Sequence, residues 1–119
     1  MPLPRALRKA LTERSMRCCE VCGQPNPTDP HHRKRQSQGG QDTLANLLDL
    51  CRGCHNGVHH EPKRARLAGY LLPRNAEPEH VPVRRWSRVH GERVLTLLRD
   101  DGTIDEEVHA WQELTLWAE

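Results

Sequence analysis

Two Cys-x-x-Cys pairs, separated by 28 residues, constrain the fold of this chain more than any other feature. The first pair is Cys19 and Cys22, and the second is Cys51 and Cys54. Each pair places two thiolates within reach of one metal ion, and two pairs complete a tetrahedral site. The spacing therefore predicts a structural zinc site without an open coordination position. Two redox-active dithiols are the alternative interpretation.

The fifth cysteine, Cys18, can replace Cys19 as a ligand, although the two-residue spacing favours Cys19. An odd number of cysteines argues against a framework built only of disulfides. Residues 1–16 lack the uninterrupted apolar stretch of a signal peptide, and no segment approaches the ~18 apolar residues of a membrane span. We therefore expect a cytoplasmic protein with reduced thiols and no membrane partner.

Large apolar side chains are scarce. Leu, Val and Ile together make up only 23 of the 119 residues, and the chain has no Phe. A large apolar core is therefore excluded, and another source of stability is needed. Zinc binding is the candidate, because in small metal-binding domains the binding free energy contributes directly to folding.

The small net charge of +2 conceals an uneven distribution. Residues 1–90 hold 16 Lys and Arg against 8 Asp and Glu, whereas residues 91–119 hold 2 against 8. A basic body with an acidic end favours a polyanionic partner for the body. A solvated basic face is the alternative.

We expect the chain to divide into an N-terminal basic helix (1–17), a zinc-braced core (18–62) and a C-terminal extension (63–119) that packs on the core and ends in acidic residues. Apolar periodicity and turn residues predict a small α+β protein. The predicted helices cover residues 3–16, 52–60 and the chain from Asp105 onward. The predicted strands cover residues 31–35, 46–50, 70–72, 81–83 and 93–98, with an exposed strand at 31–35.

Four histidines have meaningful positions between and beside the cysteine pairs. His55 and His59 are four residues apart on the predicted helix, so both imidazoles lie on one helix face. His31 and His32 are adjacent on a predicted strand and point to opposite faces. The pattern predicts three metal-binding imidazoles and one imidazole free to act as a general base. Alternatively, histidines at the helix end only interact with the helix dipole, and His60 is a substitute ligand if the helix is phased differently.

These residues resemble the HNH endonuclease motif of the ββα-metal (His-Me finger) superfamily. The spacing from Asn46 to His55 and from His55 to His59 resembles that of the colicin DNases, and the cysteine frame resembles the McrA-like branch. The resemblance implies that His31, His55 and His59 bind a catalytic Mg²⁺, Mn²⁺, Ni²⁺ or Zn²⁺ ion and that His32 is the general base. It also implies that Asn46 fixes the loop between the two strands and orients the base.

The resemblance implies that the protein hydrolyses double-stranded DNA and leaves 5′-phosphate and 3′-hydroxyl ends. The fold expected is a ββα-metal unit with an N-terminal helix and a C-terminal hairpin and helix. Similarity to phage and prophage proteins implies terminase subunits as partners in genome packaging. A monomer or weak dimer is expected, and a monomer with one site would nick. A non-catalytic zinc ribbon that binds nucleic acid is the alternative. Basic residues flank the site and are expected to bind phosphates without reading bases: Arg33, Lys34, Arg35, Lys63, Arg64 and Arg66.

Overall fold

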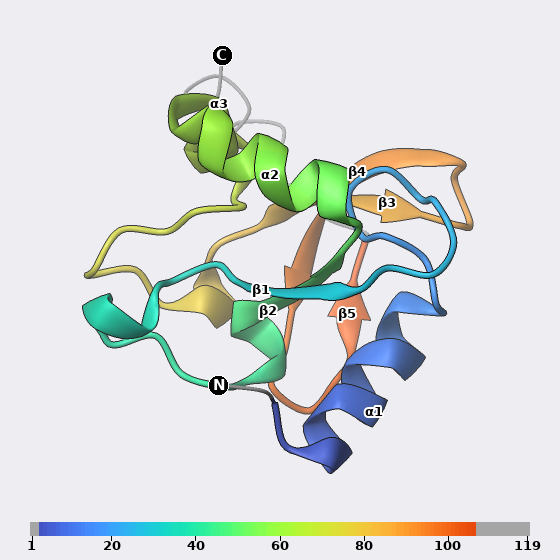
Figure 1. Cartoon of the computed structure of the whole chain (residues 1–119), viewed down its shortest axis with the longest axis horizontal. Coiled ribbons are helices and arrows are strands. Elements are labelled where there is room, and N and C mark those ends of the chain that lie inside the picture. Colours follow the sequence, from blue (N-terminus) through green and yellow to red (C-terminus); the bar gives the residue numbers. More distant parts are fainter. Residues whose placement is uncertain (1–2, 107–119) are drawn as a thin grey trace.

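The computed structural model describes residues 3–106, which form helices on two small antiparallel sheets (Figure 1). The α-helices are α1 (Arg5–Ser15), α2 (Arg52–His60) and α3 (Pro62–Ala68). The strands are β1 (Asp29–His32), β2 (Leu47–Leu50), β3 (Val83–Ser87), β4 (Glu92–Leu98) and β5 (Ile104–Asp105). Short 3-10 helices cover Gln36–Gln38, Leu44–Asn46 and Pro78–His80. This confirms the predicted small α+β class.

Helix α1 forms because its leucines recur on one face. Leu11 is fully buried against Leu44 and Leu47, and Leu3 and Leu7 pack beside it. The helix ends at Met16, whose φ of 55° is left-handed and stops the helical hydrogen-bonding pattern. The predicted helix over residues 3–16 is therefore confirmed, with its apolar stripe directed at the start of β2.

Strands β1 and β2 form an antiparallel pair, with His31 opposite Leu48, and helix α2 follows β2 directly and packs on the pair (Figure 1). This succession of two strands and a helix is the predicted ββα unit, and α2 has the predicted bounds. The expectation of an exposed strand over residues 31–35 is wrong. The strand ends at His32, and both His31 and Arg33 are buried.

The C-terminal part forms the second sheet, in the order β3, β4, β5. The predicted strand over 93–98 is confirmed as β4, whereas the strand expected over 81–83 begins only at Val83. The expected strand over 70–72 is absent from the described residues, although Leu72 donates a backbone hydrogen bond to Arg33. Asp105 lies in β5 instead of a helix, and the rest of the predicted last helix lies outside the described residues.

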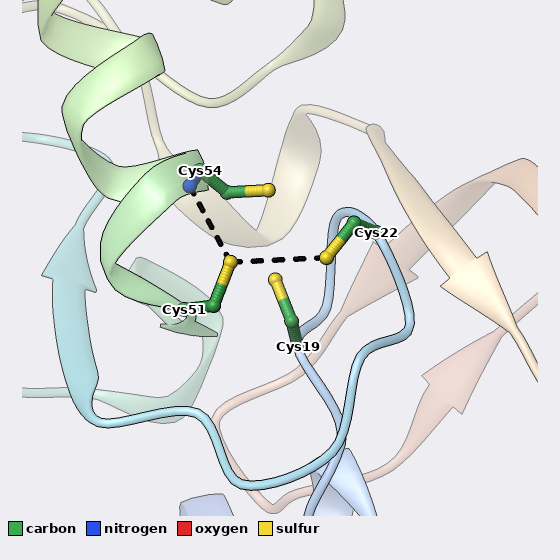
Figure 2. Close-up of side chains that lie close together, drawn as sticks. All are labelled: Cys19, Cys22, Cys51 and Cys54. Carbon is green, nitrogen blue, oxygen red and sulfur yellow. Dashed lines mark hydrogen bonds between the residues drawn. The ribbon is translucent and has the colours of Figure 1, made fainter.

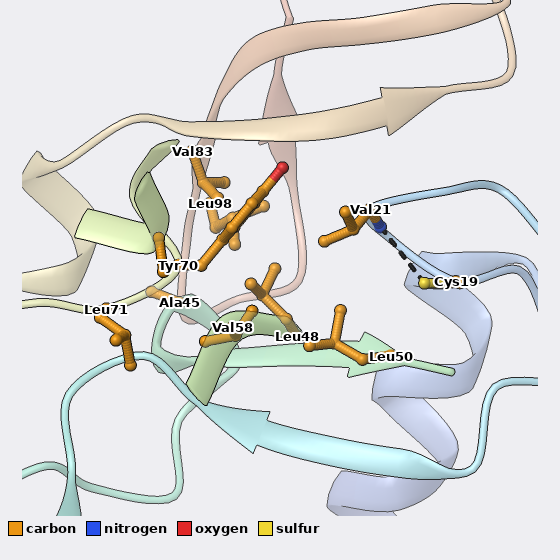
Figure 3. Close-up of a cluster of buried hydrophobic side chains, with 11 residues drawn as sticks. Cys19, Val21, Ala45, Leu48, Leu50, Val58, Tyr70, Leu71, Val83 and Leu98 are labelled. Carbon is orange, nitrogen blue, oxygen red and sulfur yellow. Dashed lines mark hydrogen bonds between the residues drawn. The ribbon is translucent and has the colours of Figure 1, made fainter. Parts of the chain in front are cut away.

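The main apolar core lies between the two sheets and helix α2 (Figure 3). Leu48, Leu50 and Val58 of the ββα unit meet Val83 and Leu98 of the second sheet. The described helices include none that is long and apolar enough to cross a membrane.

A buried ionic cluster supplements this small core. Glu20 is held between Arg14, at 2.8 Å, and Arg85, and all three side chains are buried. Burial by itself raises the pKa of Glu20, but the charges of Arg14 and Arg85 and their hydrogen bonds lower it below its usual value. The cluster joins α1, the first cysteine pair and β3, and the sequence patterns did not predict it.

Candidate functional site

The four predicted zinc ligands converge on one point. The sulfur atoms of Cys19, Cys22, Cys51 and Cys54 all lie within 4.8 Å of one another, and Figure 2 shows them directed at a common centre. Cys18 is not part of this group. Four thiols on two rigid turns fit the donor set of structural zinc, so the residues present suit a closed metal site.

Local backbone geometry explains this convergence. The turn after Cys19 is closed by a hydrogen bond from the Gly23 amide to the Cys19 carbonyl. Gly23 has a φ of +80°, and a Cβ atom there would lie 2.6 Å from the Trp86 ring, so the turn requires glycine. Cys51 is the N-cap of α2 and its sulfur accepts a hydrogen bond from the Cys54 amide.

Three of the predicted site histidines form a second group, on the β1 side of α2. Ligand nitrogens of His31, His55 and His59 lie within 4.8 Å of one another. The Nε2 atoms of His55 and His59 are 3.3 Å apart. Burial lowers the pKa of His31 to about 4, and the neighbouring His55 and His59 add to this effect. His31 is therefore neutral near pH 7, which is the protonation state that binds metal.

Two of these three histidines, His31 and His55, each have one ring nitrogen fixed by a hydrogen bond to a second group. His31 Nε2 donates to the Tyr70 carbonyl at 2.7 Å, and His55 Nδ1 donates to Asp29 Oδ2 at 3.0 Å. Because a carbonyl and a carboxylate only accept, these bonds leave His31 Nδ1 and His55 Nε2 available for a cation. A hydrogen bond from Arg52 lowers the pKa of Asp29 to about 2, so this partner is ionised.

Neither partner was predicted from the sequence. Asp29 lies two residues before His31 on β1 and is buried like it, whereas the intervening Pro30 is less buried. Side chains two residues apart lie on the same face of a strand. A strand predicted to begin at Asp29 would therefore have indicated that Asp29 lies beside His31. The Tyr70 carbonyl carries no such signal, because a backbone group 39 residues away contacts His31 only through the fold.

His32 and Asn46 occupy the loop side of β1. His32 Nε2 donates to Asp42 Oδ1 at 2.7 Å, and both side chains are partly exposed. The Asn46 side chain is fully buried and accepts from the Lys34 amide at 2.7 Å. Its Nδ2 donates to the carbonyls of Lys34 and Gln41, so Asn46 ties both ends of the loop between β1 and β2. Asp42 was missed by sequence reasoning, since a polar loop residue carries no pattern.

The predicted DNA-binding set needs one correction. Arg33 is fully buried, and its guanidinium donates to four carbonyls, of Gly69, Ala45, Pro78 and Val81, at 2.7–3.2 Å. Four of its five N–H donors are taken by these carbonyls and the side chain is closed off from solvent, so the expectation that Arg33 binds phosphate is wrong. Lys34 is partly buried, whereas Arg35, Lys63 and Arg64 are exposed.

Comparison with known proteins agrees with this geometry. Residues 19–61 match the family model described as HNH endonuclease, over just over a third of the chain. No curated protein and no solved structure gives a significant match to the chain. The ββα unit and the four-cysteine group agree with this match, so residues 19–61 are similar to an HNH endonuclease in a cysteine frame. The resemblance seen in the sequence is thereby confirmed, and a nuclease function in general is supported.

Proposed function

We propose that the protein is a metal-dependent endonuclease that hydrolyses phosphodiester bonds of double-stranded DNA to 5′-phosphate and 3′-hydroxyl ends. The observation that supports this most is the group formed by His31, His55 and His59 within a segment that matches HNH endonucleases. A divalent cation held by these imidazoles would stabilise negative charge on the phosphate and on the leaving oxygen. Imidazole ligands suit Mn²⁺, Ni²⁺ and Zn²⁺, and Mg²⁺ is the further candidate.

His32 is the proposed general base. With Nε2 donating to Asp42 at 2.7 Å, the lone pair of the ring is on Nδ1. This nitrogen takes the proton from the attacking water, and the Asp42 carboxylate stabilises the imidazolium that results. Asp42 thus acts through His32 as a positioning residue.

Asn46 supports the base indirectly. Its three hydrogen bonds to Lys34 and Gln41 hold the loop that carries Asp42, one residue after Gln41. We propose that this fixes the distance between Asp42 and His32 and therefore the orientation of the imidazole. The four-cysteine site has the separate role of a structural zinc site that keeps α2, with His55 and His59, in place.

The partners remain predictions. A monomer with one such site would nick duplex DNA, and cleavage of both strands would need a dimer or two successive visits. A role beside terminase subunits in phage genome packaging, within the host cytoplasm, is a prediction from resemblance alone.

Cleavage of supercoiled plasmid tests the proposal. Purified wild-type protein is incubated with plasmid in Mg²⁺, Mn²⁺ or Ni²⁺ and compared with His32→Ala and with His90→Ala. His90 is an exposed histidine in the turn between β3 and β4 and is the matched control. We expect nicked plasmid from wild type and His90→Ala, and a rate at least about 100-fold lower from His32→Ala.

Two outcomes would contradict the nuclease assignment. One is plasmid left intact by the wild type in all three metals. The other is equal cleavage by His32→Ala, which would indicate a contaminating nuclease. Binding of DNA without cleavage would instead favour the non-catalytic zinc ribbon, which needs the four cysteines but not His32.

A further inference from the structure

Between the loop after β1, helix α3 and the chain that follows α3, the surface is hollowed into a cleft of about 350 Å³. Three exposed arginines, Arg35, Arg66 and Arg74, line it together with the buried Arg33, Gln38 and residues 71–73. The arginines come from three separate segments: the loop after β1, helix α3 and the chain after α3. The fold, and not a run in the sequence, brings their charges to one place.

The charges in this cleft are uncompensated within the part of the chain that the structure describes. No Asp or Glu of residues 3–106 lines the cleft. Across the same residues, none of the three guanidinium groups forms a hydrogen bond or an ion pair. Like charges held together repel one another and attract an anion. Guanidinium groups also match phosphate oxygens in geometry, with two parallel N–H donors.

The cleft adjoins the proposed catalytic site. The chain that lines it continues from Tyr70, whose carbonyl accepts from His31, and Leu72 is hydrogen-bonded to Arg33 next to His32. On the other side, α3 follows α2, which carries His59.

We propose that this cleft binds phosphates of the duplex DNA backbone beside the cleavage site, with Arg35, Arg66 and Arg74 as positioning residues. The inference rests on the proposed nuclease function and names the surface that holds its substrate. The cleft takes one exposed arginine from each basic run of the sequence, Arg35 and Arg66, and adds Arg74. Arg33 also lines the cleft but is buried and donates to backbone carbonyls, whereas Arg64 lies outside the cleft with its Nη1 3.6 Å from Glu61 Oε2.

Equilibrium binding of a short fluorescent duplex tests this proposal. The measurement uses full-length His32→Ala protein so that the duplex is not cut. Arg35, Arg66 and Arg74 are all changed to Gln in one variant and to Lys in a second. A matched control changes three exposed arginines elsewhere, Arg5, Arg17 and Arg88, to Gln and so removes the same net charge. Zinc content and melting temperature confirm that each variant is folded.

The cleft Gln variant should bind the duplex at least about tenfold more weakly at about 100 mM salt. The slope of log K against log salt concentration should fall by about 2 to 3, as expected for three lost phosphate contacts. The Lys variant should keep most of this slope because it keeps the charges. The matched control should stay within about threefold of the parent, because general attraction alone is weaker than direct contact.

Equal affinity and slope in the cleft variant and its parent would overturn the proposal, and so would equal losses in the two Gln variants. The nuclease proposal fails separately. If wild-type protein cuts no plasmid but the cleft variant still loses binding, the cleft assignment stands and the nuclease assignment fails. If wild-type protein cuts plasmid and the cleft variant binds and cuts equally well, the nuclease assignment stands and the cleft assignment fails.

Discussion

At the scale of single residues, Arg33 shows how far burial changes the meaning of a charge. Its guanidinium satisfies four backbone carbonyls with 0% of the residue exposed. In Arg33→Met these carbonyls lose their donors inside the protein, which costs about 3–5 kcal/mol of unfolding free energy. Urea unfolding of zinc-loaded protein measures this loss. Arg35→Met is the control and should change stability by less than about 0.5 kcal/mol, because Arg35 is exposed. Similar losses in both variants would contradict the structural role of Arg33.

Asp29 makes a second prediction at this scale. Its carboxylate holds His55 Nδ1 at 3.0 Å and makes the opposite ring nitrogen a better ligand. Asp29→Asn should therefore weaken Mn²⁺ or Ni²⁺ binding by about 10- to 100-fold, measured by calorimetry on protein that retains its zinc. Asp42→Asn is the control, because Asp42 contacts His32 and none of the proposed metal ligands. This variant should bind the ion with the same affinity as wild type. Unchanged affinity in Asp29→Asn would show that this carboxylate does not tune the site.

The part of the candidate site that could be predicted is the part whose side chains are positioned by a single turn or a single helix. The two Cys-x-x-Cys pairs and the i, i+4 histidines depend only on turns and one helix, so their positions followed from spacing. Arg33 could not be separated from Lys34 and Arg35 in the same way. Whether a charged side chain faces solvent or backbone carbonyls depends on segments of the chain more than 30 residues away, such as those of Gly69 and Val81.

At the scale of elements, helix α2 begins at the four-cysteine group, because Cys51 is its N-cap. We expect wild-type protein to retain about one zinc ion per chain through dialysis. Cys51→Ser should lose this zinc and much of its helical signal in circular dichroism, since metal binding supplies folding free energy. Cys18→Ser is the matched control and should retain zinc, because Cys18 lies outside the four-cysteine group. Zinc loss in Cys18→Ser, or retention in Cys51→Ser, would contradict the assignment of the ligands.

The second sheet shows why elements outside the metal site were harder to predict. Strand β3 runs through Arg84, Arg85 and Trp86, a sequence without the alternation of apolar and polar residues that marks a strand. Arg85 nevertheless points to the buried face, because Glu20 is there to neutralise it. A buried ion pair between residues 65 positions apart leaves no local pattern. By contrast, Val94 to Leu98 of β4 are mostly apolar, and that strand was predicted.

At the scale of the whole molecule, Glu20 joins the parts that the sequence suggested were separate. One Glu20 oxygen accepts from Arg14 of α1 and from the Asp49 amide of β2, and the other accepts from Arg14 and from Arg85 of β3. Arg14 also donates to the carbonyls of Leu44 and Leu47. Together with the proposed zinc site, this cluster compensates for the scarcity of large apolar side chains. Its loss should therefore destabilise the whole molecule and not one element alone.

Glu20→Gln tests this coupling, because it keeps the shape of the side chain and removes the carboxylate charge that Arg14 and Arg85 share, leaving Arg85 only the longer 3.8 Å pair with Glu106. We expect about 3–5 kcal/mol lower unfolding free energy at pH 7, measured by urea unfolding followed through both tryptophan fluorescence and circular dichroism. Because the pKa of Glu20 is lowered on folding, its ionised form stabilises the protein above the usual carboxyl pKa, and this contribution is lost as the pH falls through the lowered value. The difference between wild type and Glu20→Gln should accordingly shrink toward acidic pH. Glu92→Gln, at an exposed position of β4, should match wild type. Equal stability of Glu20→Gln and Glu92→Gln would show that the buried cluster does not hold the sheets and α1 together.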